Sequence, residues 1–316
     1  MTQILTGACP NFVVQVSDRL VTTGRGVNIK EHDPAANKTV VYRAADALVT
    51  LGYSGIAYIG ETPTDWWIAQ ILYQGELKAT DGRLGIRIGA IAKPMRIGLA
   101  MKRLRDAVKA LPAHPIDSYG LEIVIAGWQG DRAGPRPIYV EISRVAGRTR
   151  IQSSPRRWPK DRNFQIGVIG QTLQSNALEK ALAPYCTGPD GPTFLPDTLD
   201  QIFVDLIRET AGDFASVGAH LMSVVLMRPG LGICGCRFRP LTPHFAIITN
   251  PTEPQTVEVS HTPWVVSSSI AYPPSLEIGK SILNLDGIDF HIFGAEPRGS
   301  LFSMTSSMRR PLPPHR

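Results

Sequence analysis

The chain has 316 residues, 43% of them hydrophobic and 19% charged, a composition that excludes disorder for most of its length. This length exceeds the roughly 100–200 residues of a usual single domain, so we expect one main domain and an appended segment. The formal net charge of +6 is partly clustered, as at Arg144, Arg148 and Arg150, but no nucleic-acid-binding motif accompanies the clusters, and we expect solvated loops there.

Residues 2–60 predict antiparallel β-structure. Side chains alternate in polarity from Gln3 to Ala8, Pro10 and Asn11 signal a turn, and β-branched and aromatic residues fill 12–16. A second pair of strands is predicted at 39–42 and 47–51. Two hairpins in succession indicate an antiparallel sheet rather than a βαβ unit.

Two helices are predicted next, over about 62–72 and about 95–111. Thr62 or Thr64 is expected to cap the first helix, and Asp65 in its first turn would complement the helix dipole. In the second helix apolar residues recur every three or four positions, and Pro112 ends the pattern.

The main block is completed by strands at 121–126, 137–142 and 164–169, helices at about 173–183 and 197–211, and a strand at 221–227. Asp197 or Thr198 is expected to cap the last helix. Because strands and helices are grouped apart, the order favours an α+β fold. Two stacked sheets, each covered by a helix pair, would bury every apolar face.

The composition of the sequence changes at about residue 229, where Gly and Pro become frequent. Short β-like runs occur at 245–249, 257–260, 264–267 and 288–293. We therefore divide the chain into a main domain of residues 2–228, a β-rich C-terminal extension of residues 229–303 without an assigned role, and a tail of residues 304–316 that is expected to be disordered.

Cysteine usage and the N-terminal sequence bear on the compartment. Four cysteines are too few for a disulfide framework, and the pair Cys234 and Cys236 has no second pair to complete a zinc site. No signal peptide is recognisable, and no apolar run approaches the roughly 18 residues of a membrane span. We expect a cytoplasmic protein that uses no cofactor.

The first 57 residues contain a candidate catalytic set. A threonine left at the N-terminus by removal of Met1 can supply its hydroxyl as nucleophile and its own α-amine as base. A nearby lysine ammonium would favour the alkoxide, and a carboxylate would hold that lysine in place. Thr2, Asp18 and Lys38 supply these groups in order, and Gly52 follows with an N–H that could approach an oxyanion.

These segments resemble the proteasome β-subunits and the HslV peptidase, which are N-terminal-nucleophile (Ntn) hydrolases. Members begin with a catalytic threonine, followed by segments like SDRRVT, NxxKL and AGxxGxA. This chain reads SDRLVT at 17–22, NKTVVY at 37–42 and LGYSGIA at 51–57. The resemblance covers roughly residues 2–228.

The resemblance implies a four-layer αββα sandwich in which Thr2 attacks an amide, with no cofactor or metal. Asp18 and Lys38 would tune the nucleophile, and the Gly52 N–H would bind the oxyanion. Asp213 would take the place of a distal aspartate that orients a serine pair near the threonine.

The sequence departs from the family at IGQTLQS, where Gln171 stands at the position of a supporting serine. The function implied is a threonine-type amidohydrolase, most simply a peptidase. Two alternatives stay open: a catalytically inactive structural subunit, and an amidase for a small non-peptide substrate. The resemblance also implies a ring-like homo-oligomer, an ATPase partner and a peptide substrate, without nucleic acid or membrane partners.

Overall fold

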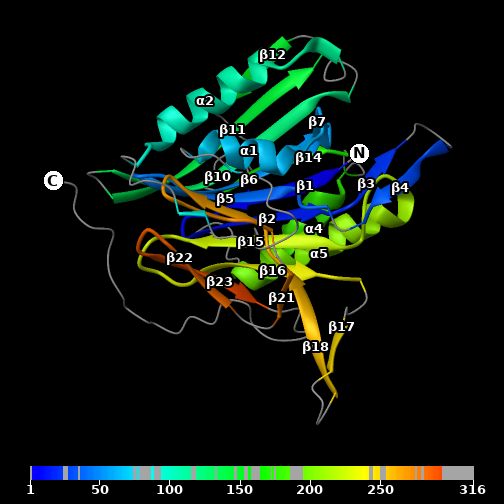
Figure 1. Ribbon diagram of the computed structural model, residues 1–316. Helices are drawn as coiled ribbons and strands as arrows, with labels where there is room; N and C mark the ends of the chain where they lie inside the picture. The colour runs from blue at the N-terminus through cyan, green and yellow to red at the C-terminus, as the bar shows by residue number, and fades with distance from the viewer. Residues whose placement is uncertain are drawn as a thin grey trace.

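The computed structural model is a mixed α+β structure in which helices flank two eight-stranded sheets, as the sequence predicts (Figure 1). It describes residues 2–23, 28–34, 36–73, 77, 87–88, 94–114, 119–131, 134–145, 148–152, 156–157, 164–171, 173, 176–185, 195–241, 245–249, 254–274, 276–278 and 281–293. The predicted tail at 304–316 lies outside these residues.

The first sheet contains the N-terminal hairpin and has the order β13-β14-β1-β2-β15-β16-β23-β22. Its strands are β13 (Arg156–Arg157), β14 (Gln165–Gly170), β1 (Gln3–Ala8), β2 (Phe12–Asp18), β15 (Leu221–Met227), β16 (Cys234–Arg239), β23 (Ile288–Phe293) and β22 (Ser281–Leu285). All neighbours are antiparallel except β16 and β23, which run parallel. The hairpin predicted at the N-terminus is therefore at the centre of a large sheet.

The second sheet contains the second predicted hairpin and has the order β12-β11-β10-β6-β5-β19-β20-β9. Its strands are β12 (Arg148–Gln152), β11 (Gly134–Val145), β10 (Leu121–Asp131), β6 (Ala47–Gly55), β5 (Thr39–Arg43), β19 (Trp264–Ser267), β20 (Ile270–Tyr272) and β9 (Arg87–Ile88). Here β19 joins β5 in parallel.

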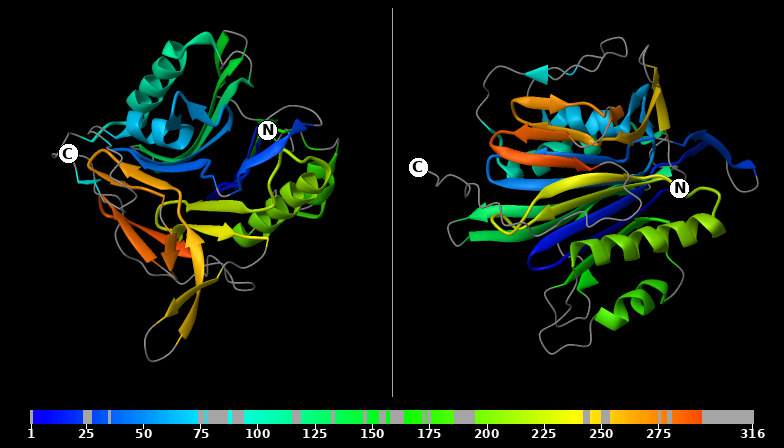
Figure 2. Two further views of the ribbon diagram at one scale, coloured as in Figure 1. Left: turned by 45° about the vertical axis from the view of Figure 1, so that its right-hand side comes forward. Right: turned by 90° about the horizontal axis from the view of Figure 1, so that it is seen from below.

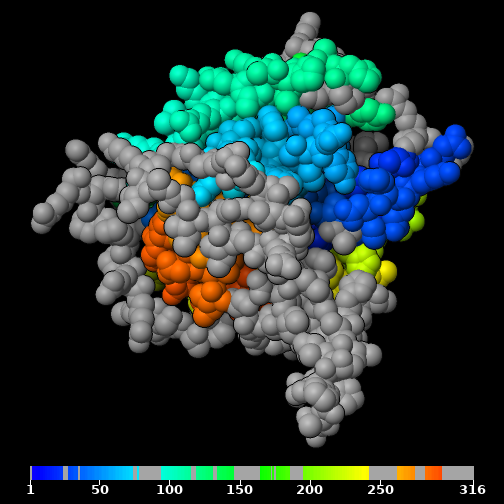
Figure 3. Space-filling model, in the orientation of Figure 1, coloured from blue at the N-terminus to red at the C-terminus, as the bar shows by residue number. Residues whose placement is uncertain are grey.

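Three small sheets stand apart from the two large ones. They pair β3 (Val21–Thr23) with β4 (Lys30–Asp33), β7 (Tyr58–Ile59) with β8 (Thr62–Pro63), and β18 (Pro254–His261) with both β17 (Phe245–Thr249) and β21 (Leu276–Ile278). The β17–β18 hairpin projects from the body in the left view of Figure 2. The β3–β4 hairpin stands out at the side of the molecule in the space-filling view (Figure 3).

Apolar side chains form three buried clusters that define the layers. One lies between α1 (Thr64–Leu72), α2 (Ile97–Ala110) and the second sheet. Another lies between α4 (Ala177–Leu182), α5 (Pro196–Asp213) and the first sheet. The third fills the space between the sheets, where Ile4 and Val41 are fully buried. Each sheet thus carries helices on its outer face, because every strand of its centre has two apolar faces to bury.

The boundaries of α1, α2 and α5 lie within two residues of the sequence prediction, whereas α4 begins at Ala177 rather than at about residue 173, and the predicted caps are wrong. Helix α1 begins after Pro63 without a side-chain cap, because the Thr64 hydroxyl donates instead to the carbonyl of Ile56 at 2.9 Å. Helix α5 follows Leu195, again without a side-chain cap, and has Pro196 at its start. A proline there needs no hydrogen-bond partner for its nitrogen.

Arg144, predicted to be part of a solvated basic loop, is buried. Its Nη1 donates to the carbonyls of Val108, Lys109 and Leu111 at 2.7, 3.3 and 2.6 Å. These carbonyls end α2, where helix geometry leaves them without partners. The guanidinium therefore caps a helix in place of solvent, a long-range contact that a local charge pattern does not reveal.

Strands of the C-terminal segment extend both large sheets, and three others, β17, β18 and β21, form a small sheet of their own. In the first sheet β16 pairs with β15, and in the second β19 pairs with β5. Val265, Phe290 and Ile292 from this segment lie in the core between the sheets. The segment is therefore part of the same hydrophobic core as the N-terminal strands.

Candidate active site around Thr2

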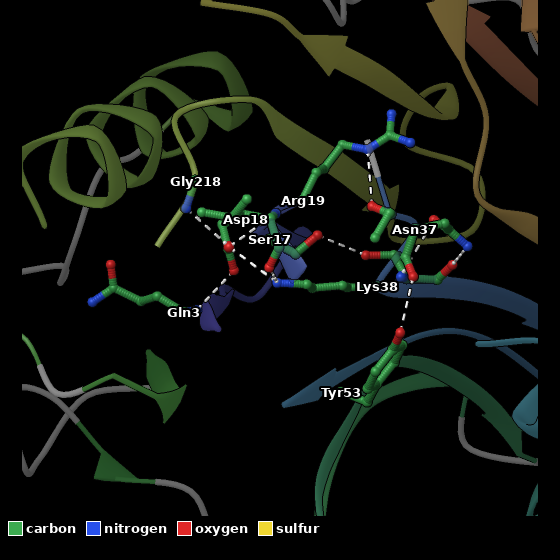
Figure 4. A network of polar contacts seen from close by, with 11 residues as sticks. Gln3, Ser17, Asp18, Arg19, Asn37, Lys38, Tyr53 and Gly218 are labelled. Carbon is green, nitrogen blue, oxygen red and sulfur yellow. Dashed lines mark hydrogen bonds and ion pairs between the residues drawn. The ribbon is translucent and has the colours of Figure 1, made fainter. Parts of the chain in front are cut away.

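The structure brings Asp18 and Lys38 together in a buried ion pair (Figure 4). Asp18 ends β2 of the first sheet, and Lys38 directly precedes β5 of the second. Lys38 Nζ lies 3.0 Å from Asp18 Oδ2 and also donates to the carbonyl oxygen of Leu20. The Asp18 and Lys38 side chains are 0% and 2% exposed. The predicted carboxylate therefore does hold the predicted lysine.

Asp18 also binds the peptide that follows Thr2. Its Oδ1 accepts a hydrogen bond from the Gln3 N–H at 2.8 Å. Its Oδ2 accepts from the N–H groups of Leu20 and Gly218 at 3.2 and 3.1 Å. An ionised carboxylate can accept about four hydrogen bonds. The bonds from these three N–H groups and from Lys38 together make four. One side chain thereby fixes the start of β1, the end of β2 and the approach to β15.

Burial changes the acid–base behaviour of Lys38. Desolvation lowers the pKa of its ammonium, while the adjacent Asp18 carboxylate opposes that shift. A buried charge acts in a medium of low dielectric constant, so its field is stronger than in water. An ammonium at this position can stabilise negative charge that develops on a neighbouring oxygen.

Thr2 is 5% exposed at the start of β1 and lies against the end of β14. Its carbonyl oxygen accepts a hydrogen bond from the Gln171 N–H at 2.7 Å. Gly170 has a φ of +84°, and a Cβ there would come within 1.8 Å of this carbonyl oxygen. The Gly170 N–H donates to Glu122 Oε2 at 3.0 Å. Gln171, found in the sequence at the position of a serine, thus contacts Thr2 through its backbone.

Ser54, near the end of β6, lies across the two sheets from Thr2. A Cβ added at Gly170 would lie 2.6 Å from the Ser54 hydroxyl oxygen as well as 1.8 Å from the Thr2 carbonyl oxygen. The two oxygens therefore approach the same point. Two residues after Thr2 in β1 and two residues before Ser54 in β6, Ile4 Cδ1 packs on Gly52. Because inward residues recur with a period of two, Thr2 and Ser54 are the next pair in this row.

Gly52 does not present a free N–H to this space. The Tyr53 N–H donates to the Lys38 carbonyl, which lies on the β5 side of β6. Because N–H groups alternate sides along a strand, those of the odd-numbered residues of β6 point toward β5. The register pairs Gly52 with Val124, so its N–H points the other way, into the ladder with β10. The oxyanion role that the resemblance assigned to Gly52 is therefore not available in this conformation.

Gly55 has the orientation that Gly52 lacks. Its N–H points to the β5 side, and the described pairing of β5 with β6 ends at Thr39 and Gly52, before it reaches Gly55. Gly55 is exposed and has a φ of +99°, and a Cβ would lie 2.3 Å from the Gly120 carbonyl oxygen. Only glycine fits there. The signal in the sequence was the second glycine of LGYSG.

Asp213, expected near the site, is the exposed last residue of α5. The segment after it turns back toward the site, where Ser216 and Val217 are buried and Gly218 contacts Asp18. A Cβ on Gly218 would lie 2.6 Å from Leu20 Cβ, so glycine permits this approach. The structure thus brings Gly218, rather than Asp213, to the carboxylate.

In the part of the chain that the structure describes, neither a metal centre nor a Cys234 thiolate competes with this site. Within the described ranges, no group of three or more His, Cys, Asp or Glu residues is arranged to hold a metal ion. Burial raises the pKa of the Cys234 thiol to about 12, which disfavours a thiolate. None of the helices that the structure describes is long and apolar enough to cross a membrane.

Comparison with known proteins gives only distant structural similarity. No family model matches the sequence, and no curated protein matches it. An Anbu (Gly-1) mutant from Hyphomicrobium sp. strain MC1 is 16% identical, with a TM-score of 0.46, over 72% of this chain and 83% of that one. Anbu from the same strain is 15% identical, with a TM-score of 0.42, over 72% and 82%. Anbu (ancestral beta-subunit) from Yersinia bercovieri is 11% identical, with a TM-score of 0.42, over 72% and 81%.

These findings correct the expected family. Membership of the proteasome β-subunit and HslV branch is wrong as stated, because the similar structures are Anbu chains at 11–16% identity. A similarity at TM-scores of 0.42–0.46 assigns neither a family nor a function. The assignment of a function must therefore come from the site itself.

Proposed function

We propose that this chain is an N-terminal threonine amidohydrolase, most simply a peptidase, whose nucleophile is Thr2 after Met1 is removed. The observation that carries the proposal is the Asp18 carboxylate, which binds the Lys38 ammonium at 3.0 Å and the Gln3 N–H at 2.8 Å. It ties a buried cation to the residue next to Thr2. A lysine so fixed near an N-terminal threonine is the arrangement that activates a hydroxyl nucleophile.

The reaction follows from these groups. The Thr2 hydroxyl attacks the amide carbon, and its proton passes to the Thr2 α-amine directly or through a water. The tetrahedral intermediate carries its negative charge on the former carbonyl oxygen, where the Gly55 N–H is the proposed donor. The C–N bond breaks as the leaving amine takes the proton. Water then hydrolyses the ester, which releases the acid and regenerates Thr2.

The layers agree with this proposal. Helices, sheet, sheet and helices follow in the order required of an αββα sandwich, with the catalytic strand β1 in the first sheet. The buried position of Lys38 also fits, because desolvation lowers the pKa of its ammonium and leaves the charge poorly screened.

A catalytically inactive structural subunit is the second candidate, and one observation favours it. The N–H of Gly52 is committed to the ladder with β10, so the donor that the resemblance expected is absent. Labelling of Thr2 decides between the two functions. The small-amide amidase, the ring-like oligomer and the ATPase partner stay predictions for the same preparation to test.

The experiment begins with the intact mass of the purified protein, because retention of Met1 leaves no free threonine amine. A β-lactone probe should then add one equivalent to the mature protein, at Thr2 in a peptide map. Thr2→Ser keeps a hydroxyl and should still be labelled, whereas Thr2→Ala should not. Failure of the mature wild type to react would refute the enzyme and leave the structural subunit.

A further inference from the structure

Asn37, the residue before Lys38, is held by contacts from two other elements. Its Nδ2 donates to Asp65 Oδ2 at 2.9 Å and to the Thr39 carbonyl at 2.9 Å. Its own carbonyl accepts from the Tyr53 hydroxyl at 3.1 Å. The Tyr53 hydroxyl therefore fixes the peptide between Asn37 and Lys38, and the Asn37 side chain spans Lys38 to the Thr39 carbonyl, in addition to the β5–β6 ladder.

Asp65 is a buried carboxylate in the first turn of α1, 6% exposed. Burial raises its pKa to about 6, and the hydrogen bond from Asn37 opposes that shift. Arg19 also favours its ionised form. Arg19 in turn also interacts with Asp33, so two acids share this guanidinium. A buried acid of this kind needs its partner, because an unpaired one is costly.

The chain from Asp65 to the active site is continuous. Asp65 holds the Asn37 amide, Asn37 fixes the backbone on which Lys38 is mounted, and Lys38 reaches Asp18. The lysine ammonium is carried on a flexible four-carbon stem, so its position is well defined only if the backbone of the lysine is fixed. Loss of the acceptor at Asp65 would leave the Asn37 N–H₂ group buried with one partner fewer.

We infer that Asp65 is a positioning residue for the reaction, acting through Asn37 to keep the Lys38 ammonium at Asp18. This inference rests on the proposed function and deepens it. A purely structural role in starting α1 is the competing explanation, since an acidic residue in a first turn stabilises a helix. The two explanations differ in what happens to the acid–base behaviour of Thr2.

An ammonium beside the Thr2 α-amine disfavours protonation of that amine and lowers its pKa. Displacing Lys38 should therefore move the pH midpoint of Thr2 reactivity upward. A lower stability of α1 does not move that midpoint as long as the protein is folded. The pH profile of labelling is thus a readout that separates positioning from stability.

The test follows the rate of β-lactone addition to mature protein by intact mass between pH 5.5 and 9. In Asp65→Ala the midpoint should rise by about 0.5–1 pH unit, with labelling at pH 7 several-fold slower. Asp65→Asn keeps an acceptor for Asn37 and should match the wild type. Asn37→Ala keeps every residue of α1, including Asp65, and should shift the midpoint as Asp65→Ala does.

Asp46→Ala is the matched control. Asp46 accepts from another amide side chain, Gln129 Nε2 at 3.0 Å, and from the Ile97 N–H at 2.8 Å that begins α2. Its loss should lower the melting temperature without moving the midpoint. An unchanged midpoint in both Asp65→Ala and Asn37→Ala, or an equal shift in Asp46→Ala, overturns the positioning role alone. No labelling of the wild type overturns the proposed function and this inference with it.

Discussion

Replacing Asp18 by asparagine should destabilise the protein severely, because it leaves the Lys38 ammonium buried without its counter-ion. Lys38 is 1% exposed and cannot turn to solvent without unpacking the end of β5. Breaking one half of a buried ion pair typically costs about 3–5 kcal/mol in the free energy of unfolding. Asparagine keeps one acceptor oxygen, which can serve either the Gln3 N–H or the N–H groups of Leu20 and Gly218, so lost hydrogen bonds add to the cost of the unpaired charge.

The double variant gives the sharper result. Adding Lys38→Met to Asp18→Asn removes the uncompensated charge and should recover at least about 1 kcal/mol, although a second buried residue has been changed. Urea unfolding at pH 7 gives the free energy of unfolding of the wild type, Asp18→Asn and the double variant. The values can be compared if the three m-values are equal. The exposed pair of Arg105 and Asp106, with side chains 32% and 50% exposed, supplies the control. There Asp106→Asn should change stability by less than about 0.5 kcal/mol.

Two results would refute this reasoning. One is an Asp18→Asn variant that loses no more stability than Asp106→Asn, which would mean that the ion pair is hydrated in solution. The other is a double variant less stable than Asp18→Asn, which would mean that the lysine is held by contacts other than the carboxylate.

Three further predictions concern other parts of the same framework. Arg144→Met should lower stability by about 2–3 kcal/mol in urea unfolding, because the last carbonyls of α2 lose a buried charged donor. Gly218→Ala should slow β-lactone labelling of Thr2 and cost about 1–3 kcal/mol, since its Cβ would overlap Leu20 and withdraw the N–H from Asp18. The folded protein holds the Asp65 proton more tightly than the unfolded chain, because its pKa is raised to about 6. The free energy of unfolding of the wild type should therefore fall as the pH rises from about 4 to 6. Asp65→Asn should be more stable than the wild type above pH 6 by about 3 kcal/mol and should have no advantage near pH 4.

The sequence predicted those features that depend on local pattern. The alternation from Gln3 to Ala8 and the helical period of 97–110 were sufficient to place β1 and α2, and with them the α+β class. The pairing of Asp18 with Lys38 was also predictable from the ordered set of motifs. Its residues lie at the ends of two hairpins, and the chain in between is short enough to bring them together.

Features that depend on long-range contact were missed. Nothing local to Arg144 shows that its partners are the carbonyls that end α2. The choice between Gly52 and Gly55 depends on which way an N–H points, which is set by the register with two neighbouring strands. Both residues are glycines in one short motif, and the sequence alone gives no means of distinguishing them.

The ion pair links the active site to the packing of the whole molecule. Asp18 belongs to the first sheet and Lys38 directly precedes β5 of the second, and the core between the sheets includes strands from the C-terminal segment. The charged pair can form only when both sheets are in place, since either residue alone would be a buried, uncompensated charge. The same requirement disfavours states in which the sheets are apart or shifted in register. The residues proposed to activate Thr2 therefore also report on correct assembly of the two sheets.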